Sequence, residues 1–311
     1  MNIKPSENIK LHALEVFFTD FTKLYNDKKM PNKILLSGKR GVGKSTLAYH
    51  VVNYALSLNE EYKYDISKFC INKNNRSFKL IQNNSHPNFY LIDLIDEKKS
   101  IDIAQVRTMI AYTNKSSFND SPRFILIDNI EYLNKNSNNA LLKIIEEPND
   151  GIFFILINNN EKNILPTLKS RCINFKINLT FEETIRTANL LLDKDIFEII
   201  NNELVNFYTT PGEIINLINF ATEKKINLKQ LTILELLILL IDNGYYKKDR
   251  YVKKLIINFI ELFLLKEYKL SITKNSILYL YHKFIYKINN VEIFNLDEES
   301  LFLEFKSKLL N

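Results

Sequence analysis

Residues 38–45, GKRGVGKS, constrain the fold more than any other part of this chain. They carry the full pattern Gly-x-x-x-x-Gly-Lys-Ser of a phosphate-binding loop. The chain contains only six glycines, and three of them, Gly38, Gly41 and Gly43, lie in this stretch. An apolar run of strand length, residues 33–37, precedes the loop, and apolar residues recur at helical spacing after it. The sequence therefore predicts a strand, a glycine turn and a helix, the first unit of an α/β fold.

This arrangement predicts a nucleotide-binding site. Successive backbone N–H groups of such a loop point at one place, where the helix dipole also favours an anion. Lys44 would contact the β- and γ-phosphates, and Ser45 would hold Mg²⁺ through its hydroxyl. The alternative is a glycine-rich turn that happens to precede a helix, and the scarcity of glycine elsewhere argues against it. The other loop residues predicted to bind nucleotide are Gly38, Gly41, Val42, Gly43 and Thr46.

Two further apolar runs predict the opposite side of this site. Residues 124–127 are typical of a parallel strand buried on both faces, and Asp128 follows at the end where α/β sheets place ligand-binding groups. Asp128 is the expected outer-sphere carboxylate partner of the Mg²⁺ held by Ser45. A third apolar run, residues 153–157, ends on three asparagines, residues 158–160. Asn158 is predicted to contact the nucleotide, although a polar loop leaving a strand is an equally good interpretation for any one of the three.

The residue after Asp128 bears on hydrolysis. Asn129 carries a carboxamide, which can hydrogen-bond a water molecule but cannot accept its proton near neutral pH. Glu131 lies two residues further on, and that offset does not point it back to the same place. We therefore expect weak or absent ATP hydrolysis by this chain alone.

Segments after the Asp128 strand carry a resemblance to a known family. They are residues 139–148 (NALLKIIEEP), the FFILI run, and residues 165–172 (LPTLKSRC), followed by residues 210–213 (TPGE). In this order they resemble the clamp-loader branch of the AAA+ ATPases and, within it, the delta-prime subunits of bacterial DNA polymerase III. The resemblance implies a ring-like assembly that opens a sliding clamp and places it on primed DNA. It implies gamma/tau-like motors and a delta-like subunit as partners, and ATP or ADP with Mg²⁺ as cofactor.

The resemblance also implies a role for the arginine of the SRC segment. In such loaders this arginine reaches ATP bound by a neighbouring subunit, so Arg171 is the expected catalytic residue in trans. A fixed guanidinium stabilises the charge that spreads over the γ-phosphate oxygens. The alternative is an arginine that pairs with a nearby acid. Cys172 is expected to be a small packing residue and not a reactive thiol.

Three departures from the family pattern favour the delta-prime position over a motor subunit. Asn129 stands where motor subunits carry a second acid, and residues 212–213, Gly-Glu, stand where they place a sensing arginine. Many bacterial members hold a four-cysteine zinc module between the phosphate loop and the Asp128 strand, but here that region contains Cys70 alone. Closed structural zinc sites need about four ligands, and His50 and His86 do not form a cluster with it. We therefore predict no zinc site.

The segments after the sheet are predicted to be helical. Thr180 and Glu183 have the spacing of a capping box that opens a helix through Leu192, residues 193–207 extend the helical region, and Pro211 suits the first turn of another helix. Such short helices after an α/β domain fit the lid of AAA+ proteins. The predicted domains are an α/β AAA+ nucleotide-binding domain at residues 1–177, a helical lid at 178–226, and a helical collar at 227–311.

The last of these domains begins with a second capping-box spacing, Thr232 with Glu235, before an apolar helix. Further helical stretches are predicted at residues 253–265 and 276–288. The family suggests an oligomerisation collar, and the alternative is a plain third domain with its own core.

Composition limits the other possibilities. No window is apolar for the length needed to span a bilayer, and the first residues lack the apolar core of a secretory signal. Two cysteines do not make a disulfide framework, so a reducing cytoplasm without membrane partners is expected. The net charge of +6 is too mild to argue for direct nucleic-acid binding. One basic run could contact DNA or an acidic partner, or be a solvated face: Lys247, Lys248, Arg250, Lys253 and Lys254.

Three hypotheses follow. The first is a loader subunit that binds nucleotide passively and supplies Arg171 to a neighbour. The second is an active motor-type ATPase, in which Glu131 or a water-positioning Asn129 replaces the usual base. The third is an unrelated phosphate-loop enzyme such as a small-molecule kinase, which would have no use for the NALLK and SRC segments. ATP hydrolysis by the isolated chain, with and without Asn129→Glu, separates the first two.

Overall fold

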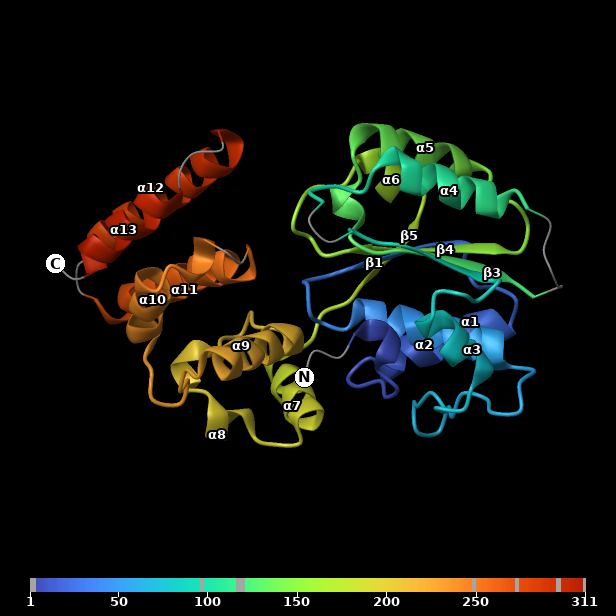
Figure 1. Cartoon of the computed structure of the whole chain (residues 1–311), viewed down its shortest axis with the longest axis horizontal. Helices are drawn as coiled ribbons and strands as arrows, with labels where there is room; N and C mark the ends of the chain where they lie inside the picture. Colours follow the sequence, from blue (N-terminus) through green and yellow to red (C-terminus); the bar gives the residue numbers. More distant parts are fainter. Residues whose placement is uncertain are drawn as a thin grey trace. The chain divides into compact units, whose positions relative to one another are not determined.

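The computed structural model describes residues 4–95, 98–115, 121–247, 250–271, 274–294 and 298–309 of the chain (Figure 1). Internal contacts divide the chain into two compact units. The first comprises Met1–Leu191 and Thr209–Asn216, and the second comprises Leu192–Tyr208 and Leu217–Asn311. This division does not test the three domains that the sequence predicts, so their boundaries stay a prediction.

A five-stranded parallel sheet forms the centre of the first unit (Figure 1). Its strand order is β2-β3-β4-β1-β5, so the ends of β3, β4 and β1 are neighbours. All five residues of β3 are buried, as expected for a strand covered on both faces. The predicted α/β fold is confirmed. The strands are β1 (Lys33–Ser37), β2 (Phe89–Ile92), β3 (Arg123–Ile127), β4 (Ile152–Asn158) and β5 (Ile173–Lys176).

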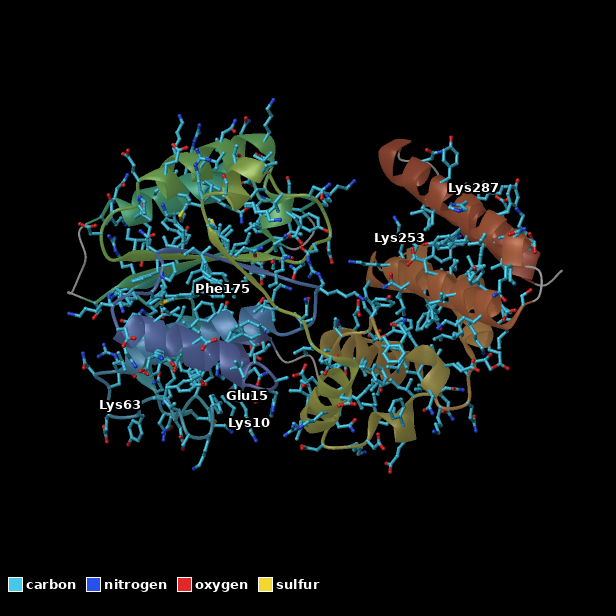
Figure 2. All side chains as sticks on the ribbon, turned by 180° about the vertical axis from the view of Figure 1, so that it is seen from behind. Lys10, Glu15, Lys63, Phe175, Lys253 and Lys287 are labelled. Carbon is cyan, nitrogen blue, oxygen red and sulfur yellow. The ribbon has the colours of Figure 1, made fainter. Side chains whose placement is uncertain are left out.

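Helices cover both faces of this sheet, with α1, α2 and α3 on one side and α4, α5 and α6 on the other (Figure 1). Alternate residues of β1 enter two separate cores: Leu36 packs with residues of α1 and α2, and Leu35 packs with residues of α4 and α5. Phe175 of β5 points toward the α1 layer, where its ring lies 4.7 Å from that of Phe21 (Figure 2). The elements are η1 (Pro5–Glu7), α1 (Glu15–Asn26), α2 (Lys44–Ser57), α3 (Arg76–Gln82), α4 (Ile103–Thr113), η2 (Ile130–Tyr132), α5 (Lys135–Glu146) and α6 (Pro166–Lys169).

The capping box predicted at Thr180 is present. The Thr180 N–H donates to Glu183 Oε2 at 2.8 Å, the Glu183 N–H donates to Thr180 Oγ1 at 3.2 Å, and α7 spans Phe181–Leu192. Helix α9 (Pro211–Lys224) begins at the predicted proline. The short helices α8 (Ile196–Ile199) and η3 (Asn202–Leu204) lie between α7 and α9 in the chain.

The helical prediction for residues 193–207 is therefore largely wrong. Asp193 has a left-handed backbone, with φ of 51°. The Asp195 carboxylate accepts from the Phe197 N–H, and the Asn201 amide oxygen accepts from the Glu203 N–H. Such local side-chain bonds compete with helical ones, so the region breaks into short turns.

The second unit contains the predicted C-terminal helices. Thr232 and Glu235 form the predicted capping box, in which the Thr232 N–H donates to Glu235 Oε2 at 2.8 Å and the Glu235 N–H donates to Thr232 Oγ1 at 3.3 Å. Helix α10 packs against α11 and α13 through buried residues that include Leu236 and Leu240. Within the described part of the chain, every helix is too short or too polar to span a bilayer. The elements are α10 (Ile233–Asp242), η4 (Tyr245–Lys247), α11 (Arg250–Leu270), α12 (Lys274–Phe294) and α13 (Glu298–Leu309).

Candidate functional site

The predicted phosphate loop connects the end of β1 to the start of α2. Gly41 and Gly43 have left-handed backbones, with φ of 86° and 95°, a conformation that costs glycine little. Gly43 is the N-cap residue of α2, so the loop leads directly into the helix N-terminus. A Cβ at Gly38 would lie 2.1 Å from the carbonyl oxygen of Ile177, which leaves room for glycine alone. The loop therefore has the shape that the sequence predicts.

Lys44 lies buried beneath this loop. Its Nζ donates to the carbonyl oxygens of Gly38 and Lys39, at 2.9 and 2.7 Å. Burial lowers the pKa of Lys44 to about 8, so the group remains mostly cationic at neutral pH. An ammonium group carries three N–H donors, and the two carbonyls use two of them. The arrangement suits a cation that contacts an anion at the loop.

Ser45 and Asp128 meet across the site. Ser45 Oγ donates to Asp128 Oδ2 at 2.5 Å, although the two residues are 83 positions apart in the sequence. Asp128 follows β3 directly, and its other oxygen accepts from the Asn129 N–H at 2.7 Å. A hydroxyl and a carboxylate are the hard oxygen donors that Mg²⁺ prefers. This donor set therefore fits a magnesium nucleotide held at the loop.

Asn129 is a buried structural amide at the strand ends. Its backbone is left-handed, with φ of 57°, and its side chain is 8% exposed. The Oδ1 atom accepts from Arg40 Nη2 and, at 3.0 Å, from Asn159 Nδ2, while Nδ2 donates to Asp93 Oδ1 at 2.6 Å. Since both ends of the amide are bonded to side chains, Asn129 ties together the ends of β2, β3 and β4 and the phosphate loop.

Asp93 is a further acid at the site that was not predicted from the sequence. This partly buried residue follows the end of β2, and desolvation, with Asp128 nearby, raises the pKa of its carboxyl group. A signal was present: an apolar run of strand length, residues 89–92, ends on an acid, as residues 124–127 end on Asp128. The acidic edge of the site is therefore wider than expected.

The three asparagines after β4 play different parts. Asn158 bonds within its own turn, because its Nδ2 donates to Asn160 Oδ1 at 2.9 Å and its Oδ1 accepts from the Asn160 N–H at 3.0 Å. Asn159 instead reaches Asn129, and its N–H donates to Glu131 Oε1 at 3.0 Å. Asn158 adjoins the loop through its carbonyl, which accepts from the Gly38 N–H at 3.2 Å. Its contact with nucleotide stays a prediction.

Glu131 lies closer to the site than its sequence offset suggested. Its side chain is 7% exposed, and burial raises the pKa of its carboxyl group. The Oε2 atom is buried and has no hydrogen-bond partner among the residues that the structure describes, and the carboxylate is within Coulomb range of Lys44. A buried carboxylate oxygen without a partner is costly, so a water molecule or a polar ligand would be favoured beside it.

Arg40 and Glu161 were also missed by the sequence analysis. Arg40 stands in the phosphate loop, and its Nε donates to Glu161 Oε1 at 2.7 Å. The second oxygen of Glu161 accepts from the Tyr132 hydroxyl at 2.7 Å. Neither partner belongs to a strand-end pattern, so no local sequence signal distinguishes this pair.

Residues 210–213, at the start of α9, pack directly on the phosphate loop. Thr210 Oγ1 donates to the Arg40 carbonyl at 2.9 Å, and the Gly212 N–H donates to the Gly41 carbonyl at 3.0 Å. Lys39 and Glu213 form an ion pair at 3.1 Å. The segment that lacks the family's sensing arginine is therefore in main-chain contact with the loop.

Arg171 follows α6 at the surface of the first unit. Its Nη1 donates to the Thr167 carbonyl at 2.9 Å, and its Nη2 forms an ion pair with Glu146 at the end of α5. Within this chain the arginine thus has the acidic partner that the alternative interpretation expects, and its role in trans stays a prediction. Cys172 packs against the core beneath α5, and burial raises the pKa of its thiol to about 11.

The remaining predicted features concern zinc and the basic run. Among the described residues, no group of three or more His, Cys, Asp and Glu side chains is arranged to hold a metal ion. The predicted absence of zinc remains a prediction.

In the basic run, Lys247 pairs with Glu299 at 2.6 Å, while Lys248 and the side chain of Arg250 lie outside the described residues. Figure 2 labels Lys253 of this run on α11. Binding of nucleic acid there stays a prediction.

Comparison with known proteins adds independent findings. A protein-family model described as DNA polymerase III, delta subunit matches residues 14–180, more than half of the chain. The chain is 31% identical over 162 residues to DNA polymerase III subunit delta' of Buchnera aphidicola subsp. Schizaphis graminum, across 52% of this chain and 47% of that protein. It is 37% identical over 158 residues to DNA polymerase III subunit gamma of the same organism, across 50% of this chain and 41% of that protein.

A longer alignment joins the chain to DNA polymerase III subunit gamma of Buchnera aphidicola subsp. Acyrthosiphon pisum. It is 28% identical over 284 residues and spans 87% of this chain and 74% of that protein. The chain spans less than half the length of the first two relatives. A solved structure of a DNA polymerase III, gamma subunit-related protein from Thermotoga maritima covers 94% of this chain and 97% of its own at 16% identity, with a TM-score of 0.46, too low to establish a shared fold.

Proposed function

Because the chain belongs to the DNA polymerase III delta subunit family, a clamp-loader family of AAA+ proteins, we propose that it is a clamp-loader subunit that binds a magnesium nucleotide. Its partners are other DNA polymerase III subunits, both gamma/tau-like motors and a delta-like subunit. Through that assembly it assists the loading of a sliding clamp on primed DNA. The observation that carries the nucleotide site is the 2.5 Å contact of Ser45 with Asp128 beside the buried Lys44.

In this proposal different residues bind the phosphates and the magnesium ion. The backbone of the phosphate loop and the N-terminus of α2 bind phosphate, and Lys44 supplies a cation to the β- and γ-phosphates. Ser45 would hold Mg²⁺ through its hydroxyl, and Asp128 would be the outer-sphere carboxylate partner of the ion, which neutralises phosphate charge when bound. Asn158 stands at the end of β4, next to the loop, and is the remaining proposed nucleotide contact.

We assign the chain to the delta-prime type, with weak or no hydrolysis of its own. The support is chemical: the group after Asp128 is an amide that cannot accept a proton, and its atoms are bonded to Arg40, Asn159 and Asp93. Arg171 is proposed to leave Glu146 and act on nucleotide bound by a neighbouring subunit. An exposed ion pair of this kind contributes only about 0–1 kcal/mol, so its exchange for phosphate costs little.

A gamma-like motor is the second candidate, and Glu131 is the observation that favours it. Within the described part of the chain, this buried carboxylate has one oxygen without a hydrogen-bond partner, and its pKa is raised, both properties of a general base. The gamma subunits among the relatives are consistent with either assignment.

Nucleotide binding by the full chain tests the proposal. We expect Mg²⁺-dependent binding that Lys44→Ala abolishes, measured by titration calorimetry, with ATP turnover at background. Rapid turnover that Glu131→Gln removes would establish the motor instead. No Mg²⁺-dependent binding of either ATP or ADP would refute the nucleotide site, and failure to assemble with the other loader subunits would refute the placement in the complex.

A further inference from the structure

Arg40 connects the phosphate loop to the acidic strand ends. Its guanidinium bonds to Glu161 at 2.7 Å and to the Asn129 amide oxygen. Half of the Arg40 side chain is exposed, whereas the Glu161 side chain is only 15% exposed and is also held by the Tyr132 hydroxyl. The arginine can therefore reorient, while the carboxylate that holds it stays in place.

The pair of Arg40 and Glu161 lies near the place where the terminal phosphate of a bound nucleotide would be. Lys44 and Ser45 mark the end of the loop where the β- and γ-phosphates would lie, and Asp128 contacts Ser45 there. Asn129 is the next residue after Asp128, and Arg40 is bonded to it. The terminal phosphate of a triphosphate would thus bring its charge to the same cluster that Arg40 contacts, whereas a diphosphate would not.

The charge of this cluster disfavours a further anion. Four carboxylates face the loop cations Lys44 and Arg40, and burial raises the pKa of two of them, Asp93 and Glu131. A triphosphate carries about one negative charge more than a diphosphate near neutral pH, because in each only the terminal phosphate bears a second ionisable oxygen. While Glu161 holds Arg40, the guanidinium does not help Lys44 and a bound Mg²⁺ to offset this charge. The four carboxylates are those of Asp93, Asp128, Glu131 and Glu161.

We propose that Glu161 competes with the terminal phosphate for Arg40, so that this site binds a nucleoside diphosphate more tightly than a triphosphate. The inference rests on the proposed nucleotide site at Lys44 and Ser45. It assigns Arg40 and Glu161 a role in specificity: the triphosphate gains the arginine only by displacing it from the carboxylate.

The test compares the affinities of Mg²⁺–ADP and of Mg²⁺ with a non-hydrolysable ATP analogue, by titration calorimetry on the full chain. The wild type is expected to bind the diphosphate more tightly. Glu161→Gln keeps the size of the side chain and an oxygen for Tyr132, but it removes the charge that holds Arg40. We expect it to raise triphosphate affinity about tenfold, since a charge-assisted hydrogen bond is exchanged. Diphosphate affinity should stay within about twofold. Adding Arg40→Ala should cancel the gain.

Glu213→Gln is the matched control, because it neutralises the acid partner of the other loop cation, Lys39, and a glutamine still serves the capping position. It should leave the ratio of the two affinities unchanged. A wild type that prefers the triphosphate, or a Glu161→Gln variant that shifts both affinities equally, overturns the inference while the nucleotide site stands. If neither nucleotide binds to either protein, the proposed function fails as well. Urea unfolding of each variant verifies that it is folded.

Discussion

The Asn129 side chain donates a hydrogen bond to Asp93, with Nδ2 at 2.6 Å from Oδ1. This contact explains why an amide is tolerated at the position where motor subunits carry an acid. A carboxylate there would face Asp93 without a donor and would adjoin Asp128 in the chain. The neutral amide after Asp128 is therefore a structural part of the strand ends.

Asn129→Glu alone should destabilise the chain and leave ATP turnover at the wild-type level. It removes a donor and sets like charges side by side, at a cost of about 1–3 kcal/mol. Adding Asp93→Asn restores a donor opposite the new carboxylate. Urea unfolding of both single variants and the double variant should give a coupling free energy of at least about 1 kcal/mol. Additive effects would show that the Asn129–Asp93 bond does not determine the residue at this position.

Arg171→Ala should lower the DNA-stimulated ATP turnover of the reconstituted loader about a hundredfold or more, if the guanidinium acts on a neighbour's nucleotide. Glu146→Gln is the matched control, because it breaks the same ion pair and leaves the arginine in place. We expect it to assemble and to turn over ATP normally. Equal losses in the two variants would mean that the pair has a structural role, and unchanged turnover with Arg171→Ala would remove the role in trans.

Gly212→Ala should displace residues 210–213 from the phosphate loop and weaken nucleotide binding. The new Cβ would lie 2.7 Å from the Cα of Gly41, a backbone atom that cannot turn away. Overpacking of this kind costs about 1–3 kcal/mol. Gly151→Ala is a suitable reference: its φ of 73° strains an alanine, yet no atom of the described residues lies within 4 Å of the added carbon. Both variants should lower the urea midpoint, but only Gly212→Ala should lower nucleotide affinity. Equal affinities would contradict the coupling.

Acid should destabilise the chain partly through His50, which is fully buried on α2. Its Nε2 donates to the Asn8 carbonyl at 3.0 Å and its Nδ1 accepts from the Tyr64 hydroxyl at 2.8 Å, as a neutral ring does. Burial lowers the pKa of His50 to about 4, below the value of about 6.5 in an unfolded chain. The unfolded state therefore binds the proton first, and stability falls as the pH drops from about 6.5 toward 4, by roughly 3 kcal/mol at most.

The measurement is the free energy of unfolding in urea at pH 7 and at pH 4.5. His50→Gln can keep both hydrogen bonds and cannot titrate, so its loss of stability across this range should be smaller than that of the wild type. Asp93 and Glu131 have raised pKa values and act in the opposite direction in both proteins. Identical losses would exclude His50 as the acid-sensitive group.

Features that depend on neighbouring residues could be predicted from the sequence. Each such feature is made by residues that lie within a few positions of one another, and the structure contains all of them. They are the phosphate loop, the strand that ends at Asp128, and the capping boxes at Thr180 and Thr232. The wrong prediction of helix at residues 193–207 also has a local cause, because Asp195 and Asn201 bond to nearby N–H groups and these bonds compete with helical ones.

Contacts between distant residues could not be predicted. Arg40 and Glu161 are separated by 121 positions, and Arg40 and Thr210 by 170. Neither pair has a spacing or a composition that distinguishes it from other surface charges and hydroxyls. Asp93 is an intermediate case. Its position at the end of a strand could be predicted from the sequence, but its contact with Asn129 could not. The Ser45–Asp128 contact was expected only because the loop and the strand end are known to converge in parallel sheets.

The close approaches around the phosphate loop have an evolutionary consequence. Gly38 is fixed by the Ile177 carbonyl, and a Cβ on Gly41 would meet Thr210 Oγ1 at 2.5 Å. Selection for a folded protein would therefore keep these two glycines in a lineage that had stopped using nucleotide, so their presence alone is no record of ligand use. The contacts of Lys44 and Ser45 belong to the nucleotide site. If a lineage lost nucleotide binding, substitutions would therefore be expected first at these two positions.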